Sequence, residues 1–598
     1  LILASSNTAV GTSALGANTT GASSTAVGSS ALAAQTTEGF NTVVGAEAGI
    51  ANTSGSGLVA MGYQALDANT TGDSNTGIGY QALGANTTAS NNTAVGYYSL
   101  LTNTTGASNT AVGRYSMRYN TTGASNTGIG IGALEQNTTA SHNTGVGAGA
   151  LNVNTTGASN TAVGSLALDA NTTGDSNTAL GVSVLGANTT GETNTAVGQN
   201  ALSTNVTANR STAVGYEALK VSNVSGDTNA SNTAVGFHAG TATTTGVADV
   251  FIGSQSGDAN TTGSQNTGVG LGSLGSNTTA SNNTAVGYLA LTANTTGTEN
   301  VAIGVGALDG NTGAHSNIAI GMDAIGAANT GANNIGIGAY SLDANTSGLN
   351  NIGVGKYALS GNTTGHSNVA IGTDALFVNT TGVENVAIGF TALDANTTGS
   401  YNTTVGTDSM GANTTGQENV AVGWNSLDSN TTGSYNIAIG ASSLGVNTTG
   451  VKNAGVGYQA LTANTTASFN NAFGYDALGT NTTGAENSAF GHSALTANTT
   501  GANNTAVGSN ALAVNTTGTQ NTAVGREAVD ANTTGAYNVG VGVFALSSNT
   551  TADANTAIGT SSLGENTTGA NNTAVGRSAL NANTTGAGNV AIGQDAGN

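Results

Sequence analysis

The chain has 598 residues, including 92 Gly but no Pro and no Cys, and only 6% of its residues are charged and 4% aromatic. This composition excludes a coiled coil, a collagen-like helix and a disulfide scaffold, and it lacks the bulky side chains that several globular cores would need. With a formal net charge of −21, the chain lacks the excess of basic residues that would attract nucleic acid or an anionic membrane. We therefore expect no nucleic-acid partner and no membrane insertion by this segment.

A glycine recurs every 17 residues along almost the whole chain, about 35 times. The spacing changes only between Gly215 and Gly236, so that a four-residue insertion lies within 216–236. Short repeats of constant length are typical of solenoids, in which each coil contacts only its neighbours. We predict an all-β parallel β-solenoid, or β-roll, that forms one continuous region over 1–598. The recurring glycine has a structural role, and its first members are Gly11, Gly28, Gly45, Gly62 and Gly79.

Each repeat begins with a predicted strand of about five residues, Asn7 to Gly11 in the first coil. The column of Val10, meaning every residue at its position in the repeat, holds only Val, Ile, Leu, Met or Phe, so we expect it to face a core. The Ala9 column is nearly always Ala or Gly, which indicates that the opposite face of the strand is crowded as well. The predicted core residues include Val10, Val27, Ile78, Val95 and Val112.

Ala14 and Leu15 follow, and we predict a second short strand there, since no apolar stripe of helical period is present. The next segment, from Asn18 to Gly21, has the composition of a turn, because Asn and Gly tolerate a positive φ. Stacking of successive coils about 4.8 Å apart would bring the Asn18-type side chains into amide ladders.

One Val and one Leu in each coil supply little burial, so we expect the Ala9 column to pack against another copy of the chain. Closed symmetric assembly is the usual form of self-association. We predict a homotrimer, an end-to-end filament, or both. Since Leu1 and Asn598 carry no polar capping element, we also expect either that the chain is a segment of a longer protein or that copies stack at their ends.

The run from Asn194 to Leu202, Asn-Thr-Ala-Val-Gly-Gln-Asn-Ala-Leu, resembles the head repeats of trimeric autotransporter adhesins. The resemblance covers nearly the whole chain, although the 17-residue repeat is a few residues longer. It implies a left-handed parallel β-roll, three chains that pack their inner strands around a common axis, and attachment at a bacterial surface. The Ala9 and Val10 columns would form that inner strand. The repeated Asn-Thr-Ala-Val-Gly and Asn-Thr-Thr-Gly segments of this chain also look like the repeats in the shafts of phage tail fibres.

Side chains that could catalyse a reaction or bind a metal are few in this sequence. The five His residues lie in different coils without a facing carboxylate, and the Asp and Glu residues lack the spacing of calcium-binding repeats, so solubility explains them better. We expect no enzyme, no metal and no cofactor. Asn-Thr-Thr also matches an N-glycosylation site in most coils, while the turn explains the same residues.

The column directly after the repeating glycine is rich in aromatic residues, which combine apolar area with a polar tip. It is the candidate contact stripe for a surface, a glycan or a neighbouring fibre, and the alternative is that its rings only stack on one another. Function is expected to be that of an extracellular or cell-surface structural fibre or adhesin shaft. A phage tail-fibre shaft on the virion tail and an ice-binding solenoid with Thr19 and Thr20 are the alternatives. The stripe comprises Tyr63, Tyr80, Tyr97, Tyr216, Phe237, Tyr288, Phe390, Trp424, Tyr458 and Tyr475.

Overall fold

The computed structural model describes residues 6–224 and 229–598 and confirms the parallel β-solenoid. It contains 35 strands of three residues each, about 17 residues apart. No helix occurs in these two ranges, and hence none that could cross a bilayer. The strands are two residues shorter than predicted, because the residue before each strand, a buried Asn in most coils, and the glycine after it belong to corners of the coil.

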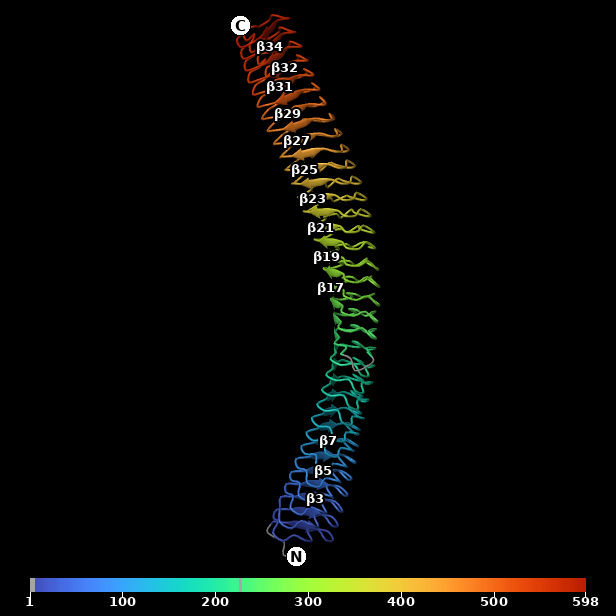
Figure 1. The fold of residues 1–598 in the computed structure, drawn as a ribbon. Coiled ribbons are helices and arrows are strands. Elements are labelled where there is room, and N and C mark those ends of the chain that lie inside the picture. The colour runs from blue at the N-terminus through green and yellow to red at the C-terminus, as the bar shows by residue number, and fades with distance from the viewer. Residues whose placement is uncertain (1–5, 225–228) are drawn as a thin grey trace. The chain divides into compact units, whose positions relative to one another are not determined.

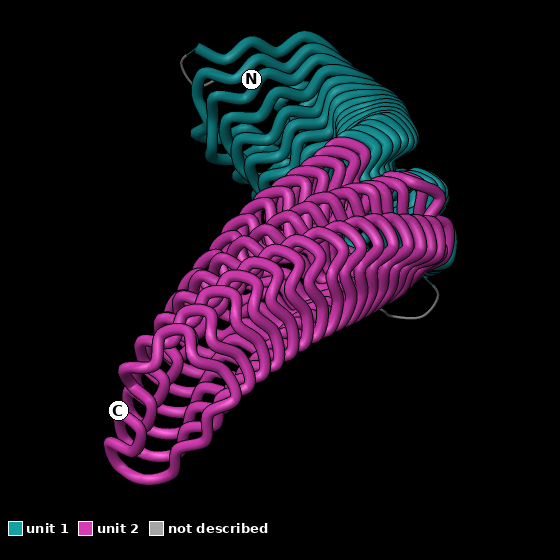
Figure 2. Tube along the Cα trace, turned by 90° about the horizontal axis from the view of Figure 1, so that it is seen from above, with its two compact units in different colours: residues 1–300 teal, residues 301–598 magenta. Residues whose placement is uncertain are grey.

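The chain divides into two compact units, 1–300 and 301–598, each built from the same repeating coil (Figures 1 and 2). The strands of the first unit are β1 Thr8–Val10, β2 Thr25–Val27, β3 Thr42–Val44, β4 Val59–Met61, β5 Thr76–Ile78, β6 Thr93–Val95, β7 Thr110–Val112, β8 Thr127–Ile129, β9 Thr144–Val146, β10 Thr161–Val163, β11 Thr178–Leu180, β12 Thr195–Val197, β13 Thr212–Val214, β14 Thr233–Val235, β15 Val250–Ile252, β16 Thr267–Val269 and β17 Thr284–Val286.

The second unit repeats this pattern from residue 301 onward. Its strands are β18 Val301–Ile303, β19 Ile318–Ile320, β20 Ile335–Ile337, β21 Ile352–Val354, β22 Val369–Ile371, β23 Val386–Ile388, β24 Thr403–Val405, β25 Val420–Val422, β26 Ile437–Ile439, β27 Ala454–Val456, β28 Asn471–Phe473, β29 Ser488–Phe490, β30 Thr505–Val507, β31 Thr522–Val524, β32 Val539–Val541, β33 Thr556–Ile558, β34 Thr573–Val575 and β35 Val590–Ile592.

Within each unit every strand pairs in parallel with the next one along the chain, so that equivalent residues of the repeat lie opposite each other. Thr8 pairs with Thr25, for example, and Val10 with Val27. The predicted insertion does not disturb this register, because Thr212 of β13 still pairs with Thr233 of β14. Residues 225–228 of the insertion lie outside the described residues.

The interior of the coil is formed by the Ala9, Ala14 and Leu15 columns, and the prediction that the Val10 column faces this core is wrong. Ala26 and Leu32 are fully buried, whereas Val10 is 57% exposed. The other four predicted core residues, Val27, Ile78, Val95 and Val112, are only half-buried.

The reason is the narrowness of the coil at the strand. A Cβ added to Gly77 of the Ala9 column would lie 3.2 Å from Leu66 Cγ and 3.1 Å from the Ala82 carbonyl oxygen. Only a small residue fits between the strand and the leucine of the preceding coil, and the larger β-branched side chain therefore points outward. The expectation that the Ala9 column packs against another copy is wrong for the same reason, because its residues are enclosed by their own chain.

The segment around Leu15 is a series of turns rather than the predicted second strand. The leucines of this column have φ between 48° and 57°, in the left-handed region that leucine seldom adopts. Successive coils still bond here, since the Leu15 N–H donates to the Ala31 carbonyl at 3.0 Å. The left-handed residue turns the backbone so that the leucine side chain enters the core.

Two columns of asparagine are buried along the coil. In the Asn18 column the predicted amide ladder is confirmed, because Asn86 Nδ2 donates to Asn69 Oδ1 at 2.9 Å and to the Ala89 carbonyl at 3.0 Å. The Asn7 column forms a second ladder, in which Asn109 Oδ1 accepts from the backbone N–H of Asn126 at 2.9 Å. These bonds satisfy polar groups that burial would otherwise leave unpaired.

Glycine is needed at two corners for different reasons. The Gly11 column has φ between 121° and 148°, and an added Cβ at Gly11 would overlap the Gly28 carbonyl oxygen. Gly21 lacks a positive φ, and there a Cβ would come 2.5 Å from the Glu38 carbonyl oxygen. The turn prediction thus located the Asn18–Gly21 corner correctly but attributed its glycine to φ instead of to the close approach of the next coil.

Candidate functional site

The column after the repeating glycine points outward, so all ten residues of the candidate contact stripe lie at the surface. Their exposed fractions range from 39% for Tyr80 to 57% for Trp424. A large aromatic side chain that is half-exposed in this way retains area for a contact with another molecule.

The stripe is organised into short stacks where aromatic residues occupy consecutive coils. The Tyr63 and Tyr80 rings have centroids 5.5 Å apart, and those of Tyr80 and Tyr97 are 5.3 Å apart. Further stacks join Tyr216 to Phe237 at 5.5 Å and Tyr458 to Tyr475 at 5.2 Å. Ring stacking, the alternative raised from the sequence, therefore takes place, and the stacked residues still remain about two-fifths to one half exposed.

A second aromatic column, one residue further along, was missed in the sequence. Tyr98 lies 4.2 Å from Tyr97 between ring centroids, and Tyr115 lies 6.2 Å from Tyr98. The sequence could have revealed this column, because Tyr98 and Tyr115 each lie two residues after the repeating glycine. It was overlooked because most coils carry a polar residue at that position. Together with their neighbours they form what we name the Tyr–Arg cluster, which consists of Tyr63, Tyr80, Tyr97, Tyr98, Arg114, Tyr115, Arg118 and Tyr119.

Cation–π contacts hold the two arginines against the rings of this cluster. The Arg118 guanidinium carbon lies 4.9 Å from the centroids of both Tyr115 and Tyr119. Partial desolvation, followed by the neighbouring Tyr98, raises the pKa of Tyr80, and a hydrogen bond with Tyr98 together with desolvation raises the pKa of Tyr97. A neutral tyrosine hydroxyl can both donate and accept a hydrogen bond, so these groups can take part in polar contacts.

The outward face of the strands is a second exposed surface. It carries the first and third residue of each strand, which are Thr and Val in most coils of the first unit. From β18 to β26 of the second unit, the first residue is also Val or Ile, with Thr403 as the exception. Ile303, Ile371 and Ile439 each remain about two-fifths exposed, so this apolar face is not covered by the chain itself.

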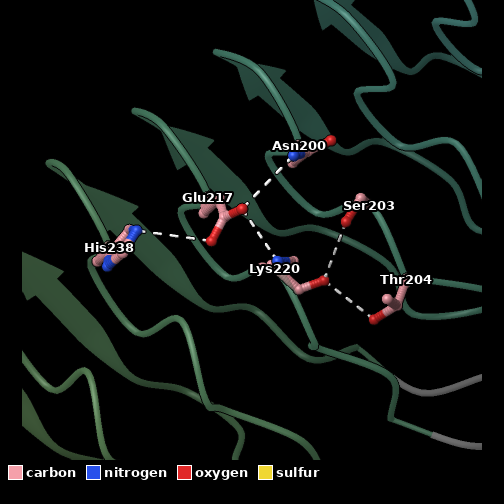
Figure 3. A network of polar contacts seen from close by, with 6 residues as sticks. All are labelled: Asn200, Ser203, Thr204, Glu217, Lys220 and His238. Carbon is pink, nitrogen blue, oxygen red and sulfur yellow. Dashed lines mark hydrogen bonds and ion pairs between the residues drawn. The ribbon is translucent and has the colours of Figure 1, made fainter.

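A polar network lies beside the insertion (Figure 3). Glu217 Oε1 accepts from Lys220 Nζ at 2.9 Å and from Asn200 Nδ2 at 3.5 Å, while Glu217 Oε2 lies 3.5 Å from His238 Nε2. The Lys220 hydrogen bond lowers the pKa of Glu217. The expectation that no histidine faces a carboxylate is therefore wrong at His238. Its partner occupies the same position of the preceding coil, 21 residues earlier, because of the insertion.

Acidic residues converge at a further place on the surface, where Asp394, Asp408 and Asp428 line an open hollow of about 360 Å³. Burial first, and then the charge of Asp408, raises the pKa of both Asp394 and Asp428. Within 6–224 and 229–598, no group of three His, Asp or Glu residues is arranged to hold a metal ion.

Two alternatives from the sequence meet geometric obstacles. The asparagines of the Asn-Thr-Thr sites are buried, as at Asn103 and Asn413, so their amides are inaccessible in the folded coil. An ice-binding surface would need free threonine hydroxyl groups. In the Thr19 column the hydroxyl is already bonded to the next coil, since Thr19 Oγ1 donates to the Thr36 carbonyl at 2.8 Å. Only the Thr20 column is left as an exposed row, and one row is a narrow surface.

No family model matches the sequence, and no curated protein matches it. The fold class is thus a long parallel β-solenoid without a family assignment.

Proposed function

We propose that the chain is a non-enzymatic extracellular fibre of the adhesin-shaft kind, related in design to the head repeats of trimeric autotransporter adhesins. One observation carries the proposal, namely that aromatic and apolar side chains are exposed at the same position in coil after coil. A single contact of this kind is weak, but many equivalent contacts on one chain give strong overall attachment. The parallel β-roll that the resemblance implies supports the same conclusion.

Self-association into a homotrimer is part of the proposal. The Val10 column and the first residues of β18–β26 form an exposed apolar strip, and soluble monomers rarely leave such strips uncovered. Three copies packed through this strand face would bury it around a common axis. The axis would then be lined by the Val10 column and not by the Ala9 column.

The contact stripe is tested by replacing three stacked tyrosines, Tyr63, Tyr80 and Tyr97, with Ser. We expect the variant to adhere more weakly than the wild type to glycan-coated and methyl-terminated surfaces in a quartz-crystal microbalance, with an unchanged circular-dichroism melting curve. The control replaces three exposed threonines of the same coils, Thr71, Thr88 and Thr105, with Ala. If adhesion is unchanged while stability falls, the rings serve only to stack on one another and the stripe is not a contact surface.

A further inference from the structure

Another exposed column, that of Ser23, comes two residues before each strand, whereas the contact stripe comes two residues after it. In about half of the coils it holds Ser, Thr or Asn. Over seven successive coils of the second unit, however, charged and aromatic residues alternate. We name this segment the alternating row, and it comprises Glu384, Tyr401, Glu418, Tyr435, Lys452, Phe469 and Glu486.

One position of the row already holds a cation between two rings. Lys452 Nζ lies 5.9 Å from the Tyr435 centroid and 5.4 Å from the Phe469 centroid. These rings belong to the coils on either side, and two coil spacings separate them by about 10 Å. The gap between alternate rings is therefore wide enough for one lysine side chain, and the ring faces attract its ammonium group.

The position two coils earlier has the same surroundings with the opposite charge. Glu418 follows Tyr401 and precedes Tyr435 in the alternating row, and an open pocket of about 480 Å³ is lined by Tyr401, Glu418 and Val420. Both tyrosines are about half-exposed. No ion pair between described residues engages the Glu418 carboxylate. The pocket thus combines an aromatic wall, an aliphatic floor and an anion without a cationic partner.

We propose that this pocket binds a lysine side chain of a partner polypeptide. Its ammonium group would pair with the Glu418 carboxylate and contact the aromatic face of Tyr401, while its methylene stem would cover Val420. The net charge of −21 attracts a basic partner from a distance. This site uses a different column from the contact stripe, and it stands whether or not the stripe adheres to a surface. Because Val420 is also the first residue of β25, the lysine site and the proposed trimer compete for this part of the strand face.

The experiment titrates the full chain with an acetylated, amidated tetralysine peptide at low ionic strength by isothermal calorimetry. Glu418→Gln keeps the shape and removes the charge, and we expect it to weaken binding about fivefold to tenfold. Glu486→Gln is the matched control, because Glu486 lies in the same row with an aromatic neighbour on one side only. Equal effects of the two variants would overturn the proposal, since they would mean that the peptide responds only to overall charge.

Two charge reversals test the geometry itself. Glu418→Lys should fill the pocket with the chain's own ammonium group and abolish the specific binding, as Lys452 does at its own position. Lys452→Glu should open a second pocket between Tyr435 and Phe469 and raise the number of peptides bound per chain from about one to about two. An unchanged stoichiometry in the Lys452→Glu variant, with a wild-type circular-dichroism spectrum, would contradict the proposed role of the flanking rings.

Discussion

At the scale of single residues, Phe251 fills volume that two neighbouring coils leave empty. It occupies a position of the Ala9 column, is fully buried, and lies next to Gly240 and Gly257, which replace the usual leucine. Val43 shows the same exchange on a smaller scale, with Gly49 at the leucine position beside it. The total volume of a coil's core is therefore maintained even where the individual residues differ.

Phe251→Ala should destabilise its coil by about 3 to 5 kcal/mol, because the adjacent glycines cannot fill the cavity. Adding Gly257→Leu should recover most of the loss, since Gly257 has φ 58° and the leucines of this column adopt the same conformation. Hydrogen exchange of the amides in β14–β16 measures the local stability. If the double variant is no more stable than Phe251→Ala alone, the two positions do not share one volume.

Asp249 replaces an asparagine of the Asn7 column and is buried in the ladder. Its Oδ1 accepts from the Asn266 N–H at 2.9 Å and its Oδ2 accepts from Asn260 Nδ2 at 3.2 Å. Burial raises its pKa from the ordinary value of 3.8 to about 7, despite these hydrogen bonds. Between about pH 4 and pH 7, the Asp249 carboxyl therefore keeps its proton in the folded state and loses it in the unfolded chain.

The stability of this coil should fall as the pH rises from about 4 to about 7, because the folded state binds the proton more tightly throughout that interval. The loss should be on the order of 4 kcal/mol once the carboxyl is ionised. Asp249→Asn restores the amide and should make the hydrogen-exchange protection of β15 independent of pH in this range. The same pH dependence in the Asn variant would show that another group is responsible.

At the scale of the repeated element, the sequence predicts the coil length, the strand position and the Asn18 ladder, since all three follow from strict repetition of residue types. It could not predict which strand face is interior. Alternation along the strand places Ala9 and Val10 on opposite faces. Which face is interior depends on the leucine of the neighbouring coil, and its contact with the Ala9 column is seen only in the folded structure. The left-handed Leu15 was equally hidden, because leucine has no intrinsic preference for positive φ.

The ladder should be the least replaceable part of the coil. Asn413 Nδ2 donates to Asn396 Oδ1 at 2.9 Å and to the Gly416 carbonyl at 3.1 Å, and its Oδ1 accepts from Asn430 at 2.8 Å. Asn413→Ala should cost about 2 to 4 kcal/mol, because buried partners lose their bonds. Hydrogen exchange of β24 and β25 is the measurement, and Thr415→Ala, at an exposed position of the same turn, should have little effect. Equal effects of the two substitutions would contradict a structural role for the ladder.

At the scale of the whole molecule, the proposed trimer makes a prediction about mass. Lysine at three positions of the outward strand face should prevent assembly, since three copies would bring these charges together on the axis. Analytical ultracentrifugation should then give one chain mass instead of three. The variant carries Ile303→Lys, Ile320→Lys and Ile337→Lys, and the control carries Thr364→Lys, Thr381→Lys and Thr398→Lys.

The control adds the same charge at exposed positions away from the strand face, so it should keep the wild-type mass. If the strand-face variant keeps that mass as well, this face does not hold copies together. The contact stripe and the lysine pocket would be unaffected by such a result, because both belong to a single chain.

The in-register pairing of each strand with the next has a genetic consequence. Every coil presents the following one with the same hydrogen-bonding edge that it received, and the register persists even across the insertion between β13 and β14. A DNA segment that encodes one coil can thus be duplicated or lost by slippage during replication without creating an incompatible junction. Chains with one coil more or one coil fewer should therefore still fold.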